Sequence, residues 1–353
     1  MNYDVVIATR NRPEALKLSI PLILTQERLP KKLIIADASD NHEIVRETVI
    51  KLVAKTGCDL KILHCKPNLP HQRNKGLEYV ESPVVVFPDD DSLWWPGVGE
   101  AIMQVYEQDT GGDIAGVCAC PSEAKQPPPK AFLALTKSTG RMRLSDRIRN
   151  RIAGVRFRIE SHISPNPLHV YGRLLWRQRR IPKWLPDLNT TPTEFMTGLC
   201  MSFRTEVLRP CGFDEDLGAY VGWAAWEDAS ASFRVLEGRL VVEAHDAKVY
   251  HYKFAGPRTG GFKAGFINQF NCAYLVSCYA PAGSSPRRAL KRYGLYKLMQ
   301  YMLAVYTSFG RQRVRGHLQA LHLTKELLDI SRDRLRQRYL ELCEKELGSH
   351  GTT

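Results

Sequence analysis

The sequence predicts an α/β fold built on a doubly wound, mostly parallel sheet. In the first hundred residues, short apolar runs rich in β-branched side chains alternate with segments of helical periodicity. This alternation predicts strands at residues 3–8, 33–37, 60–64 and 84–88, and helices near residues 13–25, 41–56 and 71–81. Right-handed crossovers place the change in strand order beside the first strand. The carboxyl ends of the first and fourth strands should therefore meet at one crevice.

The fourth predicted strand ends in three consecutive aspartates, Asp89, Asp90 and Asp91. Ligands of α/β folds bind at the carboxyl ends of the strands. Neighbouring carboxylates repel one another, so this cluster requires a compensating cation. Oxygen ligands favour Mg²⁺ or Mn²⁺, which usually share their coordination shell with substrate phosphates. The alternative is a solvated acidic turn in which Asp90 or Asp91 caps the next helix.

Polar residues also follow the first two strands. They are Thr9, Arg10, Asn11 and Arg12 after the first strand, and Asp37 and Ser39 after the second. Together with the aspartates, these residues should face one nucleotide-sized cleft. The sequence contains neither G-x-G-x-x-G nor G-x-x-x-x-G-K. A bound nucleotide would therefore be held through a metal ion and side chains.

A second acidic motif comes later in the chain, where Glu227 and Asp228 precede a segment of helical periodicity. Carboxylates are favoured in the first turn of a helix, so the pair is interpreted either as a helix cap or as catalytic acids. Trp223 and Trp226 favour the second interpretation, because indole faces pack against sugar rings while a carboxylate accepts a hydroxyl proton.

The sequence pattern divides the chain into a nucleotide-binding half (residues 1–120), a basic insert (121–193), an acceptor half (194–284) and a helical basic tail (285–353). Although the net charge is +13, the cations are concentrated in two segments. Residues 125–184 hold 15 Lys and Arg against two acids, and residues 287–353 hold 14 against six. The remainder is net acidic, so the charge does not indicate a nucleic-acid-binding protein. The insert is interpreted as a helical lobe or a partly disordered surface loop.

Nine cysteines without a CxxC pair predict reduced thiols in a cytoplasmic protein. The chain starts at once with a strand-like segment, which leaves no room for a secretory signal. No run approaches the ~20 apolar residues of a spanning helix. We therefore expect a soluble or peripheral protein.

In their order along the chain, these elements resemble the family 2 glycosyltransferases of GT-A fold. The matching segments are Val5–Arg12, Ile34–Ser39, Asn68 with Gln72–Gly76, Phe87–Asp91, Gly212–Glu215, Trp226–Asp228 and Val249–His251. Each segment is short, but seven of them in the expected order make a chance match improbable.

The resemblance implies a role for individual residues. The side chains implied to bind a nucleoside-diphosphate sugar are Thr9, Asn11, Arg12, Asp37, Arg73, Asn74, Asp89 and Asp90. Asp91 would bind Mg²⁺ or Mn²⁺, with His251, or alternatively His245, beside the metal ion. Asp228 would be the general base of an inverting transfer, and Glu227, Trp223 and Trp226 would bind the acceptor.

Two further segments carry positive charge. Lys253, Arg258 and Lys263 lie in a Gly-rich run that suits a flexible lid over a diphosphate, or an ordinary surface loop. In the tail, apolar residues recur at helical spacing from Leu295 to Phe309, between clusters of Arg and Lys. This pattern predicts one amphipathic helix, either lying on an anionic membrane or packed on the catalytic domain.

The sequence thus predicts an inverting, metal-dependent glycosyltransferase that acts on a glycan or lipid-linked glycan. We expect it to function in bacterial surface polysaccharide synthesis, attached peripherally to the inner face of the cell membrane. The alternatives are a metal-dependent nucleotidyltransferase, and a non-catalytic protein that binds nucleotide sugars or nucleic acid. The indoles beside Glu227 and Asp228 favour sugar transfer over nucleotidyl transfer, and the paired acids favour it over nucleic-acid binding. A non-catalytic protein that binds nucleotide sugars stays an alternative.

Overall fold

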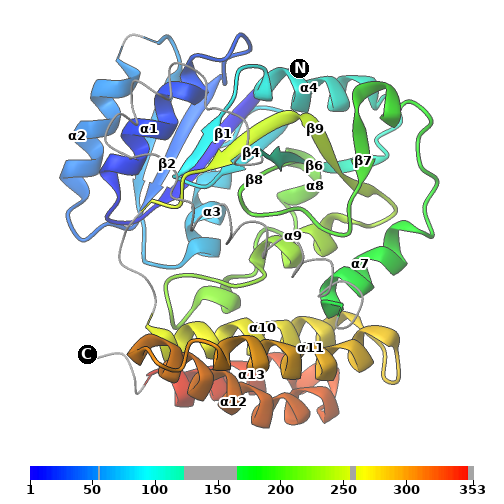
Figure 1. The fold of residues 1–353 in the computed structure, drawn as a ribbon. Coiled ribbons are helices and arrows are strands. Elements are labelled where there is room, and N and C mark those ends of the chain that lie inside the picture. The colour runs from blue at the N-terminus through cyan, green and yellow to red at the C-terminus, as the bar shows by residue number, and fades with distance from the viewer. Residues whose placement is uncertain (55, 123–164, 255–259, 349–353) are drawn as a thin grey trace. The chain divides into compact units, whose positions relative to one another are not determined.

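The computed structural model describes residues 1–54, 56–122, 165–254 and 260–348. The chain forms two compact units (Figure 1). The α/β unit comprises Met1–Ala124, Gly172–Thr259 and Leu340–Thr353, and the helical unit comprises Lys125–Tyr171 and Gly260–Tyr339. The predicted start of the tail at residue 285 thus falls inside the helical unit. Much of the predicted basic insert, residues 123–164, lies outside the described residues.

The α/β unit contains a nine-stranded sheet. Its strands are β1 (Tyr3–Thr9), β2 (Lys32–Asp37), β3 (Asp59–His64), β4 (Val84–Pro88), β5 (Ser92–Trp94), β6 (Ile114–Pro121), β7 (Thr190–Pro192), β8 (Cys200–Arg204) and β9 (Leu240–His251). The order is β3-β2-β1-β4-β8-β6-β9-β5, and β7 pairs with β9. β7 lies within the segment predicted as the insert, so the last residues of that segment belong to the sheet.

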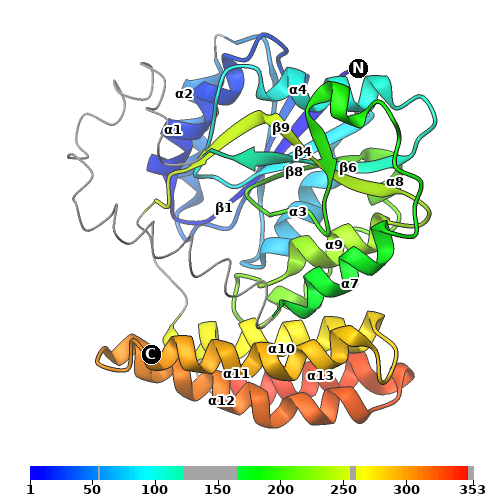
Figure 2. The same ribbon diagram turned by 45° about the vertical axis from the view of Figure 1, so that its right-hand side comes forward.

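Helices cover both faces of this sheet. They are α1 (Pro13–Leu24), α2 (His42–Val53), α3 (Leu69–Leu77), α4 (Val98–Gln108), α8 (Thr205–Leu208) and α9 (Glu227–Val235), and α7 (Pro167–Trp176) crosses the boundary between the units. Figure 2 shows α1, α2 and α4 on one side of the sheet and α3 and α9 on the other. Because both faces are covered, β1, β2 and β4 are almost entirely buried.

The predicted doubly wound arrangement is confirmed for the first four strands. β1 pairs in parallel with β2 on one side and with β4 on the other, so the change in strand order lies beside β1. The second half of the sheet is mixed, because β8 runs antiparallel between β4 and β6. β8 begins at Cys200. The preceding residues form the irregular segment that reaches the site.

The short strand β5 was not predicted, and it determines the position of His251. β5 pairs antiparallel with the end of β9, with Ser92 opposite His251. Asp91 directly precedes Ser92, and its carbonyl oxygen accepts a hydrogen bond from the Tyr252 N–H. This pairing joins the acidic triplet to a residue 160 positions further along the chain.

The helical unit is built around α10 (Gly261–Tyr279), with α11 (Ser285–Met302), α12 (Ser308–Asp329) and the first half of α13 (Arg332–Leu347). α10 and α12 approach closely at Gly265, where an added Cβ would lie 2.1 Å from the Arg313 carbonyl oxygen. The prediction of one continuous amphipathic helix from Leu295 to Phe309 is wrong. α11 ends at Met302 and α12 begins at Ser308, so the apolar residues span a corner between two helices.

Candidate active site

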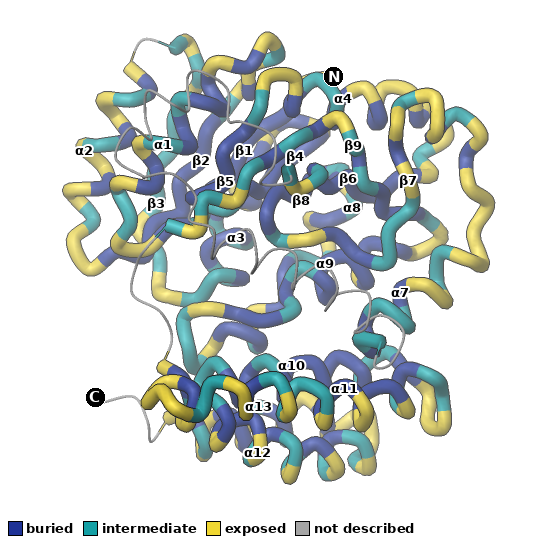
Figure 3. Tube along the Cα trace, in the orientation of Figure 1, coloured by how far each residue is buried: buried dark blue, intermediate teal, exposed yellow. Residues whose placement is uncertain are grey.

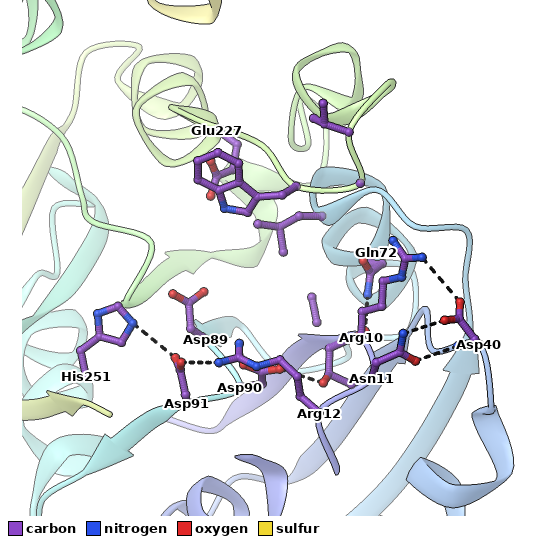
Figure 4. Close-up of a pocket in the computed structure, with 16 residues that line it drawn as sticks. Arg10, Asn11, Arg12, Asp40, Gln72, Asp89, Asp90, Asp91, Glu227 and His251 are labelled. Carbon is purple, nitrogen blue, oxygen red and sulfur yellow. Dashed lines mark hydrogen bonds and ion pairs between the residues drawn. The ribbon is translucent and has the colours of Figure 1, made fainter. Parts of the chain in front are cut away.

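A cavity of about 610 Å³ opens at the carboxyl ends of β1 and β4. This volume is typical of a small-ligand site. Residues 9–12, the acidic triplet, Trp223, Glu227 and His251 all line it. Figure 4 shows Asp89, Asp91 and His251 on one side of the cavity and Arg10, Asn11 and Asp40 on the other, with Glu227 above them. The fold therefore brings both predicted acidic motifs to one site.

Asp91 is the most connected carboxylate of the triplet. One oxygen pairs with Arg12 Nη2 at 2.6 Å and accepts a hydrogen bond from the Phe254 N–H, and the other lies 3.4 Å from His251 Nε2. Burial by itself raises the pKa of Asp91. The His251 and Arg12 contacts outweigh it and lower this pKa to about 2. Asp91 is therefore a carboxylate at neutral pH, as a metal ligand must be.

Asp90 has a different environment from Asp91. It accepts a hydrogen bond from Thr9 Oγ1 at 2.8 Å and pairs with Arg12 Nη1 at 2.6 Å. Burial raises the pKa of Asp90 to about 7, and Arg12 only partly opposes this effect. Thr9 and the half-buried Arg12 thus form one network around the buried Asp90, in which Arg12 supplies a cation to the triplet.

The side chains of Asp89, Asp91 and His251 fit a divalent metal ion. One ligand atom from each lies within 4.8 Å of the others. Two carboxylate oxygens and one imidazole nitrogen are suitable ligands for Mn²⁺ and tolerable for Mg²⁺. His245, the alternative to His251, lies instead with Cys120 and Glu243. Its Nδ1 is 3.1 Å from Glu243 Oε1, and its Nε2 is 2.9 Å from Thr191 Oγ1.

Arg73 connects the two acidic motifs. It is almost fully buried, with Nη2 3.1 Å from Asp89 Oδ1 and Nη1 3.0 Å from Glu227 Oε1. Its guanidinium also lies over the Phe213 ring. Arg73 therefore orients a carboxylate on each side of the site. It is not among the residues that line the cavity, so the donor contact that the sequence predicted for it stays a prediction.

Glu227 and Asp228 form the first turn of α9. Both oxygens of Asp228 accept backbone N–H groups, from Gly198 at 2.9 Å and Ala229 at 2.8 Å. Burial, with the charge of Asp228 beside it, raises the pKa of Glu227 to about 8, and burial also raises the pKa of Asp228. Glu227 lines the cavity directly. An added Cβ on Gly198 would lie 3.5 Å from Glu227 and 3.6 Å from Asp228, at ordinary van der Waals distance, so Gly198 lies beside both acids.

Replacing Arg73 with Met should destabilise the fold by about 3–5 kcal/mol, because Glu227 and Asp89 would lose a buried partner. The double variant Arg73→Met/Glu227→Gln should recover part of this loss, since one of the stranded carboxylates is then neutral. Urea denaturation of both variants measures the effect. Equal stability of Arg73→Met and the parent protein would contradict the bridging role.

The opposite end of the cavity is polar and is organised by Asn11. This residue has a left-handed backbone (φ 55°), its N–H donates to Ser39 Oγ, and its side chain exchanges two hydrogen bonds with Asp40. Asp37 is fully buried and binds Ser39 and His42 rather than lining the cavity. Asp40 takes the exposed position here and pairs with Arg10 at 3.5 Å.

Other predicted residues lie at varied distances from the cavity. Asn74 binds the Phe213 backbone and the Glu215 carboxylate, so it supports the Gly212–Glu215 segment. Trp223 lines the cavity, whereas Trp226 caps α9 in a left-handed conformation (φ 70°) and packs on Phe195.

The residues predicted to form a lid are placed separately. Lys253 follows the site with a left-handed backbone (φ 53°). Arg258 lies outside the described residues, and Lys263 lies in the regular helix α10. The predicted loop therefore ends at Gly260, before Lys263.

Sequence reasoning gave no role to Gln72 or Asp40. Gln72 Nε2 donates to the Thr9 and Ala36 carbonyl oxygens, which joins the ends of β1 and β2 below the cavity. In the sequence, only its position in the matching segment Gln72–Gly76 pointed to Gln72. The position of Asp40 just beyond β2 was the only signal for that residue.

A parallel sheet that changes strand order beside β1, with an acidic triplet at the end of β4, agrees with the predicted GT-A fold of glycosyltransferases. Residues 4–164 match the model of "Glycosyl transferase family 2". This match confirms the predicted resemblance to the family. No curated protein matches the chain.

Two solved structures are similar to this chain at low sequence identity. A mannosyltransferase, PcManGT from Pyrobaculum calidifontis, in complex with GDP-Man and Mn²⁺, superposes with a TM-score of 0.51 at 12% identity, over 93% of this chain and 86% of that one. TarS 1–349 from S. aureus gives a TM-score of 0.46 at 14% identity, over 98% of this chain and 91% of that one.

Proposed function

We propose that the protein is an inverting glycosyltransferase that moves a sugar from a nucleoside diphosphate to an acceptor hydroxyl. The observation that carries this proposal is the arrangement of the two acidic motifs. Asp89, Asp91 and His251 lie on one side of a single cavity, and Glu227 and Asp228 lie across Arg73 from Asp89. A direct displacement needs a leaving-group site and a base on opposite sides of the reacting carbon.

The donor half of the site would bind the nucleotide through polar side chains. Thr9, Asn11 and Asp40 offer hydrogen-bonding groups to the base and ribose, and Arg10 and Arg12 offer cations to the diphosphate. A divalent metal ion held by Asp91, Asp89 and His251 would neutralise the departing diphosphate. The complex of PcManGT with GDP-Man and Mn²⁺ supports this combination of ligands.

In the acceptor half, we assign the general base to Asp228. Two backbone N–H groups hold its carboxylate in one orientation, and these bonds stabilise the charged form that accepts a proton. Glu227 lines the cavity beside it and would bind the acceptor, with Trp223 against the sugar ring. The base would take the proton of the acceptor hydroxyl as the hydroxyl attacks the sugar carbon, inverting its configuration.

We further propose a glycan or lipid-linked glycan acceptor in bacterial surface polysaccharide synthesis, with the enzyme held peripherally at the inner face of the cell membrane. The separation of a net acidic catalytic sequence from basic flanking segments supports this location. Among the residues that the structure describes, no helix has both the length and the apolarity to cross a bilayer.

The function is tested by incubating the protein with UDP-, GDP- and dTDP-sugars, with Mn²⁺, with Mg²⁺ or with a chelator. Release of nucleoside diphosphate from at least one donor, only in the presence of metal, is the expected result. Release of sugar 1-phosphate, with the nucleoside monophosphate transferred, would indicate nucleotidyl transfer instead. With an acceptor present, a β-linked product from an α-linked donor is expected, and an α-linked product would exclude the inverting mechanism.

The rate of transfer should rise with pH, because the base must be deprotonated and burial raises the pKa values of Glu227 and Asp228. kcat/KM should therefore increase about tenfold per pH unit below the apparent pKa of the pair, and level off above it. Glu227→Gln removes the member of the pair whose pKa is about 8, so the profile should then follow Asp228 alone and move to lower pH. An unchanged profile in this variant would show that the two carboxyl groups do not titrate together.

A further inference from the structure

The corner between α11 and α12 exposes an apolar surface of its own. Leu303, Tyr306 and Met299 have 75%, 82% and 69% of their surface exposed, and Leu295, Met302 and Phe309 are also exposed. We call these six residues the apolar corner. Figure 3 marks this part of the helical unit as exposed. Single exposed apolar residues are ordinary, whereas six within fifteen positions mark an interaction surface.

The apolar corner is separate from the packed face of α11. The residues that α11 buries include Leu290, Tyr293 and Tyr301, which follow helical spacing on one face. Leu295, Met299 and Met302 lie on the opposite face. The sequence left open whether the predicted apolar pattern packed on the fold or faced a partner. The structure assigns packing to a different set of residues, so this pattern faces outward.

Hydrogen bonds and a required glycine fix the backbone of the corner. Arg311 Nη1 donates to the Val305 and Tyr306 carbonyl oxygens, and Thr307 caps α12 by accepting the Gly310 N–H. An added Cβ on Gly310 would lie 1.8 Å from the Ala304 carbonyl oxygen, so the turn requires glycine. The turn is therefore already ordered before binding, so less conformational entropy is lost when its apolar side chains bind a partner.

The charge around the corner defines the partner. In the helical unit, residues 260–325 contain ten Lys and Arg and not one Asp or Glu. Lys291 and Arg292 lie one turn before the corner on the exposed side of α11, and Arg315 is exposed on α12. A second copy of the chain would bring equal charges together, which disfavours a dimer through this face. Nucleic acid would meet the cations but offers no apolar phase to bury Leu303 and Met299.

We propose that the apolar corner inserts into an anionic lipid bilayer while Lys291, Arg292 and Arg315 contact the headgroups. Apolar residues beside cations are the composition of interfacial membrane anchors, which bury their apolar face about 5–10 Å deep. The inference rests on the proposed function for the location of the acceptor at a membrane. It goes beyond that function by naming the residues that enter the lipid.

Vesicle binding tests this inference. The protein should sediment with phosphatidylglycerol vesicles at low salt and much less with phosphatidylcholine vesicles, and 1 M salt should release it, since the screening length is then about 3 Å. Lys291→Gln/Arg292→Gln/Arg315→Gln should weaken binding on the order of 100-fold, at about fivefold per cation. The control Arg46→Gln/Lys51→Gln, which removes exposed cations from α2, should bind like the parent.

Insertion is separated from surface attraction by fluorescence. The indole of Tyr306→Trp should be quenched by lipids brominated on their acyl chains, and the indole of the control Tyr79→Trp should not. Leu303→Gln/Tyr306→Gln should lower vesicle binding at least tenfold, whereas Ile44→Gln, an exposed apolar residue of α2, should not change it. Quenching of neither indole, or binding indifferent to lipid charge, would overturn the proposal.

An assay for release of nucleoside diphosphate from a soluble donor tests the proposed function separately from membrane insertion. The corner variants should retain it, since they lie outside the site. Vesicle binding without donor turnover would overturn the function and leave the insertion standing. Turnover without vesicle binding would overturn the insertion alone. A shift to dimer that Leu303→Gln abolishes, or binding to RNA in place of vesicles, would also overturn it.

Discussion

Substituting Asp228 with Asn should lower the turnover of sugar transfer by about 10²- to 10⁴-fold, because the amide cannot accept the proton of the acceptor hydroxyl. The amide keeps the shape of the side chain, so the affinity for the donor should change little. Steady-state kinetics with saturating donor measures the loss, and calorimetry with the nucleoside diphosphate measures donor binding. Loss of both together would indicate a structural role at the start of α9.

The matched variant is Glu227→Gln at the neighbouring position. Glu227 lines the cavity and pairs with Arg73, so its loss should raise KM for the acceptor more than it lowers kcat. The geometry makes this comparison informative, because both acids are near Gly198. If Glu227→Gln lost turnover and Asp228→Asn kept it, Glu227 would be the base and Asp228 the residue that orients it.

Substituting Asp91 with Asn should lower metal-dependent turnover at least about 100-fold, because the metal ion loses a negatively charged ligand. Donor binding measured by calorimetry should become insensitive to Mn²⁺. In the parent protein, a chelator should have the same effect as the substitution. Metal-dependent binding that survives in Asp91→Asn would exclude the triplet as the metal site.

The two histidines provide the control for this experiment. His251→Gln should raise the Mn²⁺ concentration needed for half-maximal activity, because Nε2 lies 3.4 Å from Asp91. His245→Gln should leave it unchanged, since His245 contacts Glu243 and Thr191 instead. The reverse outcome would move the metal ion to the cluster of Cys120, Glu243 and His245.

Some of the site followed from local patterns in the sequence. β1 and β4 are buried on both faces, so each is an apolar run in the sequence. The residues just beyond the carboxyl ends of the two strands must then lie close together. Thr9, Arg12 and the triplet could therefore be placed together without coordinates. Glu227 and Asp228 could be assigned to a helix start, but their position opposite the triplet could not be derived from that pattern.

Other assignments required the folded chain. Periodicity alone did not distinguish the exposed side of α11 from its packed side, because both carry apolar residues. It also could not separate Asp37, which is buried and satisfied by Ser39 and His42, from Asp40, which lines the cavity three residues later.

The sequence by itself determined the parallel half of the sheet, the acidic triplet at its edge and the resemblance to family 2 glycosyltransferases, because these features depend on neighbouring residues and their order. Only the tertiary structure decided which histidine reaches Asp91 and that Arg73 joins the two acidic motifs. The physical reason is that an antiparallel register between β5 and β9, and a buried ion pair 154 residues apart in sequence, depend on packing between distant segments. Hydrophobic periodicity reports which side of one segment is buried, and not which other segment covers it.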